Sequence, residues 1–530
     1  MTPILTANQM KACDTYTIES LGIPSRTLME RAARKAVEAL ISRDDLFPAG
    51  KILLLCGGGN NGGDGLAMAR FLAEDYGRSV SVLYTGRPTP DGLPDLNRMS
   101  TECRRQLELA TLAGISILPL SATEIALDGA AVVVDAVFGI GLDRPVEGEI
   151  ADLLTAVAER GVSVLAVDIP SGIHADTGAV MGTALPAKMT VTMQTLKAGL
   201  LLYPGADYCG EILVADLGID LSSVENPFAR LADHELLRRV LPPRARRSHK
   251  GTYGRVGLLC GSDGMSGAAV LATRASLRSG AGLSDVLTTE SNRVVLQTTV
   301  PEAIVTVRTG EALEKSIQIA DGMAIGCGLG TAEEAYESLK TALNALPADG
   351  SIPVVLDADG INLLAGHEDL WQTKLLSSPQ KQVVVTPHPA EMARMSGLRV
   401  PEILQDLPGV ARSFAREKGI TVILKDAHTA IASPDGELYL CVAGNAGMAK
   451  GGSGDVLAGV VAALLTQNRH RLGRDVSVAE VAAAAVYLHA KAGDLAAAQK
   501  GEYGLLATDV IEYLPAVCRE LSDSRTSLVQ

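Results

Sequence analysis

The chain has 530 residues, which is too long for a single ordinary hydrophobic core, so we expect two or more domains. Its formal net charge of −14 argues against a general nucleic-acid-binding protein, although local basic pockets for phosphate remain compatible with it. A hydrophobic fraction of 47% argues against disorder, and 3% aromatic residues with 54 glycines favour parallel α/β layers with tight turns.

The first half of the chain predicts a doubly wound α/β domain. Residues 6–41 have the spacing of two helices separated by a break at 22–25. Apolar runs without polar alternation then predict strands buried on both faces, separated by helical patterns, at 51–56, 80–84, 131–135, 162–168, 189–193 and 211–215.

The composition changes near residue 225, where Asn226-Pro227 is followed by a cluster of basic residues. This change predicts a domain boundary, with a first domain at 1–222, a linker at 223–248 and a second domain at 249–520. Most of the basic cluster is typical of a solvated linker, and a phosphate-binding role stays open for one or two of its members.

The second half repeats the α/β pattern. Strands are predicted at 255–260, 283–288, 303–307, 322–325, 353–356, 382–386, 421–425 and 429–431. The helical region 478–498 is rich in alanine, which favours close packing and leads us to expect a homo-oligomer.

The chain lacks the sequence signals of export and of membrane insertion. Its N-terminus has no basic segment followed by an apolar one, and no uninterrupted apolar run is long enough to span a bilayer. We therefore expect a cytoplasmic protein that binds neither membranes nor nucleic acid. The eight cysteines form no C-x-x-C pair, so neither a zinc site nor a disulfide framework is expected; Cys56, Cys260 and Cys327 indicate small core residues.

A first candidate site begins at the loop G-G-G-N-N-G-G-D-G (57–65), between the first buried strand and a predicted helix at 66–73. Such a loop is typical of phosphate binding. Asp135, Asp168 and Ser171 follow other strands, and the carboxyl ends of parallel strands share one edge. Asn61, Asp135 and Ser171 together could hold a hard cation, and Asp168 is the best candidate for proton transfer. Either aspartate alone is more often only the cap of a turn.

A second candidate site is the stretch G-N-A-G-M-A-K-G-G-S-G-D-V-L-A-G (444–459). Glycines let the backbone approach a ligand closely, and a helix that follows directly leaves its first N–H groups free for an anion. Asp455 lies at the edge of this predicted phosphate site, where it can take a proton from a hydroxyl group. The alternative is a glycine-rich loop that only turns the chain.

The motifs of the first half, including V-D-A-V-F-G-I-G (134–141) and V-D-I-P-S-G (167–172), resemble the N-terminal YjeF-type domain, an epimerase of hydrated NADH and NADPH. The resemblance covers roughly residues 1–220. It implies a potassium ion among Asn61, Asp135 and Ser171. It also implies dinucleotide contacts from Asn60, Asn61, Gly62, Gly63, Asp64, Gly139, Ile140, Gly141, Leu142, Asp143, Arg144, Pro145 and Asp168.

The motifs of the second half include G-S-D-G-M-S-G-A-A (261–269), G-C-G-L-G (326–330), V-V-L-D-A-D-G-I-N (354–362) and T-P-H-P-A-E (386–391). They resemble the ribokinase-like ADP- or ATP-dependent NAD(P)H-hydrate dehydratases over residues 235–520. The whole chain is thus similar to the bifunctional NAD(P)H-hydrate repair enzymes. The implied fold is two three-layer αβα domains, the first Rossmann-like and the second ribokinase-like.

The second resemblance implies that Mg²⁺ binds with ADP or ATP and that Asp455 is the base. It implies nucleotide contacts from Lys425, Asp426, Ala427, His428, Thr429, Asn445, Met448, Lys450, Gly451, Gly452, Ser453 and Gly454. The implied contacts with the hydrated cofactor are Ala269, Gly330, His388 and Asp455. Asp357, Asp359 and Asn362 at a strand end suit substrate or magnesium, and His388 by itself would more often be a turn residue.

Two positions depart from the family pattern. Ala390 and Asp426 stand where glycine is expected, which puts the nucleotide preference in question but not the family. Two other functions use similar residues. A ribokinase-type kinase for a hydroxymethylpyrimidine or thiazole would share the G-S-G-D geometry, but it has no need of the fused first domain. A non-catalytic dinucleotide sensor would leave Asp455 without a task.

Overall fold

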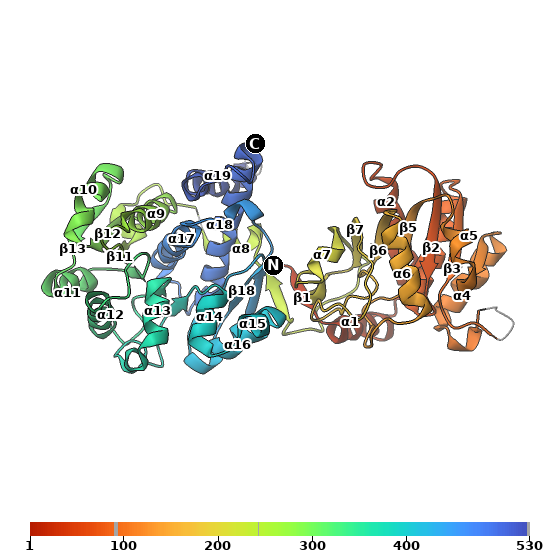
Figure 1. Ribbon diagram of the computed structural model, residues 1–530, viewed down its shortest axis with the longest axis horizontal. Helices are drawn as coiled ribbons and strands as arrows, with labels where there is room; N and C mark the ends of the chain where they lie inside the picture. Colours follow the sequence, from red (N-terminus) through yellow and green to blue (C-terminus); the bar gives the residue numbers. More distant parts are fainter. Residues whose placement is uncertain (90–93, 242, 527–530) are drawn as a thin grey trace. The chain divides into compact units, whose positions relative to one another are not determined.

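The computed structural model describes residues 1–89, 94–241 and 243–526. The chain divides into two compact units, one of residues 2–229 and one of residues 230–530 together with Met1. Each unit is a parallel α/β structure (Figure 1). The segment 223–248, expected as a linker, contains β10 (Ala229–Leu231) and α8 (His234–Val240). Leu236, Leu237 and Val240 of α8 are buried in the core of the second unit.

The sheet of the first unit has the strand order β4-β3-β2-β5-β6-β7-β9, and all of its described neighbours pair in parallel. The order reverses between β2 and β5, which is where doubly wound folds bind their ligands. The strands are β2 (Lys51–Cys56), β3 (Val80–Tyr84), β4 (Ser116–Pro119), β5 (Ala130–Ala136), β6 (Ser163–Val167), β7 (Met189–Met193) and β9 (Glu211–Ala215).

Helices cover both faces of this sheet (Figure 1). On one face lie α1 (Ala7–Glu19), α2 (Ser25–Ile41), α3 (Asn60–Glu74) and α4 (Thr101–Leu112); on the other lie α5 (Thr123–Leu127) and α6 (Glu149–Glu159). Short β1 (Pro3–Leu5) pairs in parallel with β8 (Leu196–Lys197), and α7 (Ala206–Cys209) precedes β9.

The predicted start of α3 at Leu66 is wrong, because the helix begins at Asn60. Three glycines in its first turns let the helix lie close against its surroundings. A Cβ on Gly62 would lie 1.8 Å from the carbonyl oxygen of Gly57, and a Cβ on Gly65 would lie 2.8 Å from Sγ of Cys56. The second half of the glycine loop is therefore helical, and it carries its polar side chains at a helix N-terminus.

The sheet of the second unit has the order β13-β12-β11-β14-β15-β16-β17-β18-β19-β10. Strands β13 to β17 pair in parallel, β17 to β19 are antiparallel, and β10 runs parallel to β19. The sequence predicted all of these except β19 and β10. Apart from β10, the strands of this sheet are β11 (Arg255–Leu259), β12 (Leu283–Thr288), β13 (Ile304–Val307), β14 (Gly322–Ile325), β15 (Val354–Leu356), β16 (Val383–Val385), β17 (Thr421–Leu424), β18 (Thr429–Ala432) and β19 (Leu438–Cys441).

One face of this sheet packs on α8, α9 (Ser266–Arg278), α17 (Ser453–Asn468), α18 (Val478–Lys500) and α19 (Ala507–Thr526). The alanines of α18 from Ala482 to Ala485 are fully buried in this core. They are packed inside their own unit, so the subunit contact that we expected from them has no support in their position. The other helices are α10 (Glu290–Thr299), α11 (Gly310–Gln318), α12 (Glu333–Ala345), α13 (Asp359–Gly366), α14 (Pro389–Ser396), α15 (Val400–Gln405) and α16 (Leu407–Lys418). Within the described residues, no helix has the length and apolar character needed to cross a membrane.

Candidate active sites

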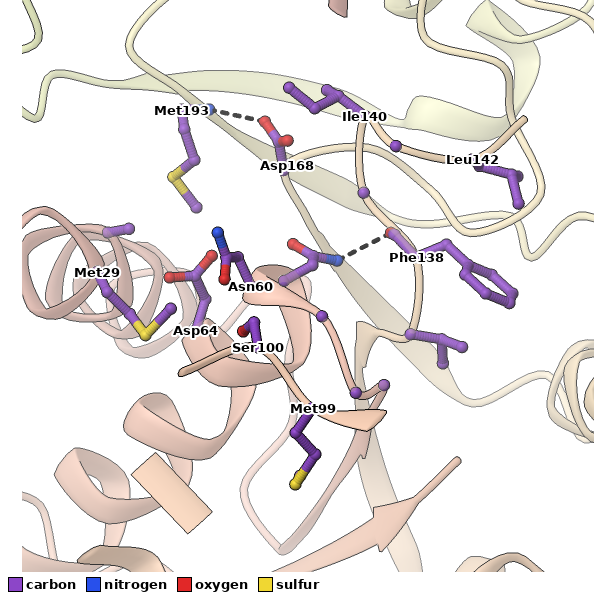
Figure 2. A pocket seen from close by; sticks show the side chains of 18 of the residues that line it. Met29, Asn60, Asp64, Met99, Ser100, Phe138, Ile140, Leu142, Asp168 and Met193 are labelled. Carbon is purple, nitrogen blue, oxygen red and sulfur yellow. Dashed lines mark hydrogen bonds between the residues drawn. The ribbon is translucent and has the colours of Figure 1, made fainter. Parts of the chain in front are cut away.

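The first unit contains a cavity of about 1090 Å³ beside the start of α3 and the carboxyl ends of β2, β5 and β6 (Figure 2). Its size suits a dinucleotide-like ligand. The predicted residues that line it are Asn60, Asn61, Asp64, Gly139, Ile140, Gly141, Leu142, Arg144 and Asp168.

Four other predicted contacts of this site lie outside the lining of the cavity. Gly62, Gly63, Asp143 and Pro145 are not among the residues that line the cavity. A Cβ on Gly63 would lie 2.7 Å from Cε of Met29 and 3.2 Å from Cα of Cys103. The structure therefore uses Gly62 and Gly63 for the close packing of α3.

Asp168 follows β6 and forms a buried ion pair with Lys197. Its backbone has a φ of 68°, which is unusual for a residue other than glycine. Nζ of Lys197, a residue with no exposed surface, donates to Oδ1 of Asp168 over 2.7 Å. Lys197 was not predicted as a site residue, although a lysine inside the apolar stretch T-L-K-A-G-L-L (195–201) was a usable signal.

All the protons of Lys197 have acceptors, since Nζ also donates to Oγ1 of Thr192 and to the carbonyl oxygen of Met193. The backbone N–H of Met193 (3.2 Å) and Oγ1 of Thr192 (3.4 Å) also donate to Oδ1 of Asp168. Among the described residues, none donates to Oδ2 of Asp168. One carboxylate oxygen is thus fixed, and the other is available to a ligand in the cavity.

Asp64 lies in the wall of the same cavity, on the first turns of α3. Burial, together with the negative charges of Asp168 and Asp14, raises the pKa of the Asp64 carboxyl group well above its usual value. Burial also raises the pKa of Asp14 on α1, which lines the cavity too. These surroundings therefore favour the protonated form of the Asp64 carboxyl group.

The three residues predicted to hold a cation do come together, around Phe138. Oγ of Ser171 donates to Oδ1 of Asp135 (2.6 Å), and the N–H of Ser171 donates to Oδ2 (2.8 Å). Nδ2 of Asn61 donates to the carbonyl oxygen of Phe138 (2.8 Å), whose N–H donates to Oγ of Ser171 (2.9 Å). Burial raises the pKa of Asp135 to about 6, partly offset by the hydrogen bonds from Ser171.

The surroundings of Oδ1 of Asn61 indicate that a binding partner is missing at this point. It is buried and has no hydrogen-bond donor among the described residues. A buried amide oxygen without a partner is unfavourable by about 1–3 kcal/mol. Amide, carboxylate, hydroxyl and carbonyl oxygens from Asn61, Asp135, Ser171 and Phe138 form a donor set that fits a hard cation.

The second unit gathers polar side chains where its parallel strands end. Cys327, Asp357, Thr386 and Lys425 follow β14, β15, β16 and β17, and Asp455 lies in the first turn of α17. Sγ of Cys327 and carboxylate oxygens of Asp357 and Asp455 all lie within 4.8 Å of one another. Parallel strands end at one edge of the sheet, which explains why residues far apart in sequence meet here.

Lys425 places a positive charge beside this group. Its Nζ donates to Oδ1 of Asp357 (3.3 Å) and lies 3.9 Å from Oε2 of Glu391. Burial lowers the pKa of Lys425, but the charges of Asp357 and Glu391 outweigh this effect and leave the pKa raised. A Cβ on Gly454 would lie 3.6 Å from Nζ of Lys425, so the ammonium group lies beside the first turn of α17.

We call residues 451–454 the phosphate cradle. Gly452 has a φ of 94°, and a Cβ there would lie 2.5 Å from Cδ1 of Leu271, so both conformation and space require glycine. α17 begins at Ser453, which leaves its first N–H groups free of helical partners. Together with Lys425, they form a site for an anion.

Asp455 directly follows this cradle in the chain. Burial raises its pKa to about 6, the charge of Asp357 adds to the increase, and a hydrogen bond from Cys327 opposes it. Cys327 was predicted as a core residue; it is buried, and it also contacts Oδ2 of Asp357 at 3.6 Å. Cys327 lies between two glycines of G-C-G-L-G at the end of a strand, and this position could have indicated a site residue in the sequence.

His388 is the N-cap of α14. Its Nδ1 accepts hydrogen bonds from the N–H groups of Ala390 (3.1 Å) and Glu391 (3.3 Å). Nε2 lies 3.4 Å from Oε1 of Glu391. Burial and the positive charges of Lys425 and Arg394 keep the pKa of His388 low against the influence of Glu391, so the ring is neutral. The capping role accounts for the turn geometry, and about half of the side chain remains exposed.

Asp359 and Asn362, predicted beside Asp357, form hydrogen bonds with protein groups. Oδ2 of Asp359 accepts from the N–H of Gly330 (2.8 Å), and Nδ2 of Asn362 donates to Oδ1 of Asp359 (3.3 Å). Arg394 donates to Oδ1 of Asn362. These bonds hold the loop of Gly330 in place.

The remaining predicted contacts lie around the cradle in varied settings. Asn445 donates to Asp494, and Nζ of Lys450 donates to the carbonyl oxygen of Tyr503. Ala269 is fully buried beneath Gly261. Those with at least part of their surface exposed are Asp426, Ala427, His428, Thr429, Asn445, Met448, Lys450, Gly451, Gly452, Ser453 and Gly454. No contact was predicted for Thr386, whose Oγ1 donates to Asp357, or for Glu391 beside Lys425.

Comparison with protein families agrees with this division into two sites. Residues 25–199 match the model of the YjeF-related protein N-terminus, and residues 256–516 match that of NAD(P)H-hydrate dehydratase. A curated relative from Moorella thermoacetica, a bifunctional NAD(P)H-hydrate repair enzyme, is 36% identical over 99% of this chain and 98% of its own. Another from Escherichia coli, with the same description, is 35% identical over 96% of this chain and 93% of its own.

Among solved structures, the chain is similar to an ADP/ATP-dependent NAD(P)H-hydrate dehydratase from Bacillus subtilis that was co-crystallised with ATP and Mg²⁺. The sequence identity is 31%, the TM-score is 0.47, and the match covers 55% of this chain and 99% of that one.

Proposed function

Because the chain belongs to the family of bifunctional NAD(P)H-hydrate repair enzymes, we propose that its two sites divide the repair between them. The protein restores hydrated NADH and NADPH: its first unit epimerises the hydrates and its second unit dehydrates them. The kinase fused to a dinucleotide-binding domain, our alternative, is not favoured, since relatives with this description match nearly the whole chain.

In the first unit, Asp168 acts on the hydroxyl-bearing C6 of the nicotinamide ring. The fixed Oδ1 and the available Oδ2 support this role, because a base needs one oxygen in reach of the substrate and a fixed orientation. Lys197 balances the negative charge of Asp168 inside the unit, and it orients the carboxylate.

A potassium ion fits the oxygens of Asn61, Asp135, Ser171 and Phe138, with the partnerless Oδ1 of Asn61 as the supporting observation. When bound, the ion would supply a positive charge to the wall of the cavity. The chain's own residues then fix the loop after β5 against α3 through Asn61 and Phe138.

In the second unit, the chemical problem is that hydroxide leaves C6 poorly. Transfer of a phosphoryl group from ADP or ATP to the C6 hydroxyl turns the leaving group into phosphate, which the lone pair of the ring nitrogen can expel. Loss of a proton from C5 then restores the dihydronicotinamide. Asp455 accepts the hydroxyl proton during the transfer, and this role rests on its place beside the cradle.

The cradle and Lys425 bind the phosphates of the nucleotide. The free N–H groups of α17 and the ammonium group beside Gly454 support this proposal. Mg²⁺ would suit the carboxylate oxygens of Asp357 beside the cradle, and when bound it would neutralise phosphate charge. His388 orients the hydrated cofactor through its exposed half.

One experiment tests both activities. The purified protein is mixed with the R and S hydrates of NADH, with ADP, with ATP or without nucleotide, and the return of the dihydronicotinamide absorbance is followed. We expect complete conversion with at least one nucleotide and none without. Asp455→Asn should abolish the return, whereas full activity of this variant would contradict the proposed base. A stable phosphorylated product would indicate a kinase instead.

The cytoplasmic location and the homo-oligomer stay predictions, and sedimentation of the purified protein measures the latter.

A further inference from the structure

Two carboxyl groups approach the cavity of the first unit from different elements. Asp168 follows β6, and Asp64 lies on α3. Both residues line the same cavity, and Figure 2 shows Asp64 beside Asn60, and Asp168 bonded to the backbone of Met193. In the proposed function only Asp168 has a chemical task, and Asp64 is expected only to contact the dinucleotide.

The surroundings of the two carboxyl groups differ in the sign of their charge. Asp168 has a buried ammonium group at 2.7 Å and N–H and hydroxyl donors on the same oxygen, all of which stabilise a carboxylate. For Asp64, no donor and no cation within ion-pair distance is found among the described residues, and the neighbouring charges of Asp168 and Asp14 are negative. Two carboxyl groups in such opposed environments suit one acid and one base.

Epimerisation at C6 has a requirement that a single carboxylate does not meet. When inversion proceeds by cleavage of the C6–O bond, the hydroxyl group leaves one face of the ring, and an oxygen returns to the other face. The departing oxygen needs a proton donor, and the incoming water needs a proton acceptor, on opposite faces.

We propose that Asp64 is the second catalytic group of the epimerase, acting as the general acid opposite Asp168. Its carboxylic acid gives a proton to the C6 hydroxyl group, and the ring nitrogen's lone pair forms the N1=C6 double bond as the C6–O bond breaks and water leaves. A water molecule then adds to the opposite face of C6 and returns the electron pair to N1. Asp168 accepts the proton of this water. The proposal rests on the proposed role of Asp168.

The step is balanced in atoms and charge. One water leaves and one is added, and a proton has moved from Asp64 to Asp168. Exchange with solvent through the open side of the cavity, where Asn60 is exposed, restores the starting state. In the reverse direction the two residues exchange roles, with protonated Asp168 as the acid and ionised Asp64 as the base.

The test uses the full chain without nucleotide, so that dehydration does not remove the products. Pure R hydrate is incubated in water enriched in ¹⁸O, and its conversion to the S form is followed by chromatography and mass spectrometry. We expect each epimerised molecule to carry ¹⁸O at C6, because the C–O bond must break. Products that keep their original oxygen would overturn the proposal, and this result needs no variant.

Asp64→Asn keeps the size of the side chain and removes the acid. We expect it to lower the rate of epimerisation by at least about 100-fold, the usual contribution of a general acid, while binding of the hydrate is retained. Asp75→Asn, an exposed aspartate at the end of the same helix, is the matched control and should keep the full rate. Nucleotide-dependent dehydration of the S hydrate reports whether the second unit is intact in each variant.

The outcomes separate the inference from the proposal on which it rests. Loss of epimerisation in both Asp64→Asn and Asp168→Asn supports the pair. If Asp168→Asn is inactive and Asp64→Asn keeps its rate, only the inference fails. If Asp168→Asn keeps its rate, the proposed role of Asp168 fails as well.

Discussion

Nζ of Lys197 lies 2.7 Å from Oδ1 of Asp168, and neither residue has more than about a tenth of its surface exposed. Removing one partner of such a buried pair leaves the other charge without compensation. Lys197→Met should therefore destabilise the first unit by about 3–5 kcal/mol and reduce epimerisation more than dehydration. Hydrogen exchange of β5 and β6 measures the stability. Lys188→Met, which changes an exposed lysine just before β7, is the control, and an equal loss there would contradict the importance of the pair.

The rate of dehydration should depend on pH through Asp455. Its pKa is raised to about 6, and only the ionised form accepts a proton. The value of kcat/KM should therefore fall as the pH drops below about 6 and level off above it.

Two variants should shift the pH limit, which is the pH below which kcat/KM falls, in opposite directions. Asp357→Asn removes a charge that raises the pKa of Asp455, so the limit moves to lower pH. Cys327→Ala removes a hydrogen bond that lowers this pKa, so the limit moves to higher pH. Profiles that move together, or not at all, would exclude Asp455 as the titrating group.

Potassium should stabilise the first unit by binding to its folded form. Each tenfold increase of the ion above its Kd adds about 1.4 kcal/mol of stability. We expect a higher melting temperature in K⁺ than in the bulky cation N-methylglucamine at equal ionic strength. Asn61→Leu should remove the difference, because it removes the oxygen that has no partner among the described residues. A K⁺ effect of unchanged size in this variant would place the ion elsewhere.

Two glycines of the same loop should respond differently to alanine. A Cβ on Gly62 would overlap the carbonyl oxygen of Gly57 at 1.8 Å, whereas nothing lies within 4 Å of a Cβ on Gly59. Gly62→Ala should destabilise the first unit by about 3 kcal/mol or more, and Gly59→Ala should leave its stability unchanged. Denaturant unfolding of the two variants provides the comparison.

The sequence by itself determined the layered α/β fold and most strands of both sheets, although β4, β10 and β19 were not predicted. Apolar runs such as 51–56 lack polar alternation, and this property is local, so it can be seen in the chain. The glycine loops and the strand-end aspartates were visible for the same reason. Because parallel strands end at one edge, the meeting of Asn61, Asp135 and Ser171 could also be predicted.

Only the tertiary structure decided the partners of these groups and their charge states. Lys197 is close to Asp168, and Cys327 is close to Asp357 and Asp455, through packing between distant segments. The start of α3 at Asn60 depends on the space that Gly62 finds beside Gly57. Burial and neighbouring charge set the pKa of Asp64 and Asp455, and both are properties of the folded surroundings rather than of the residue type.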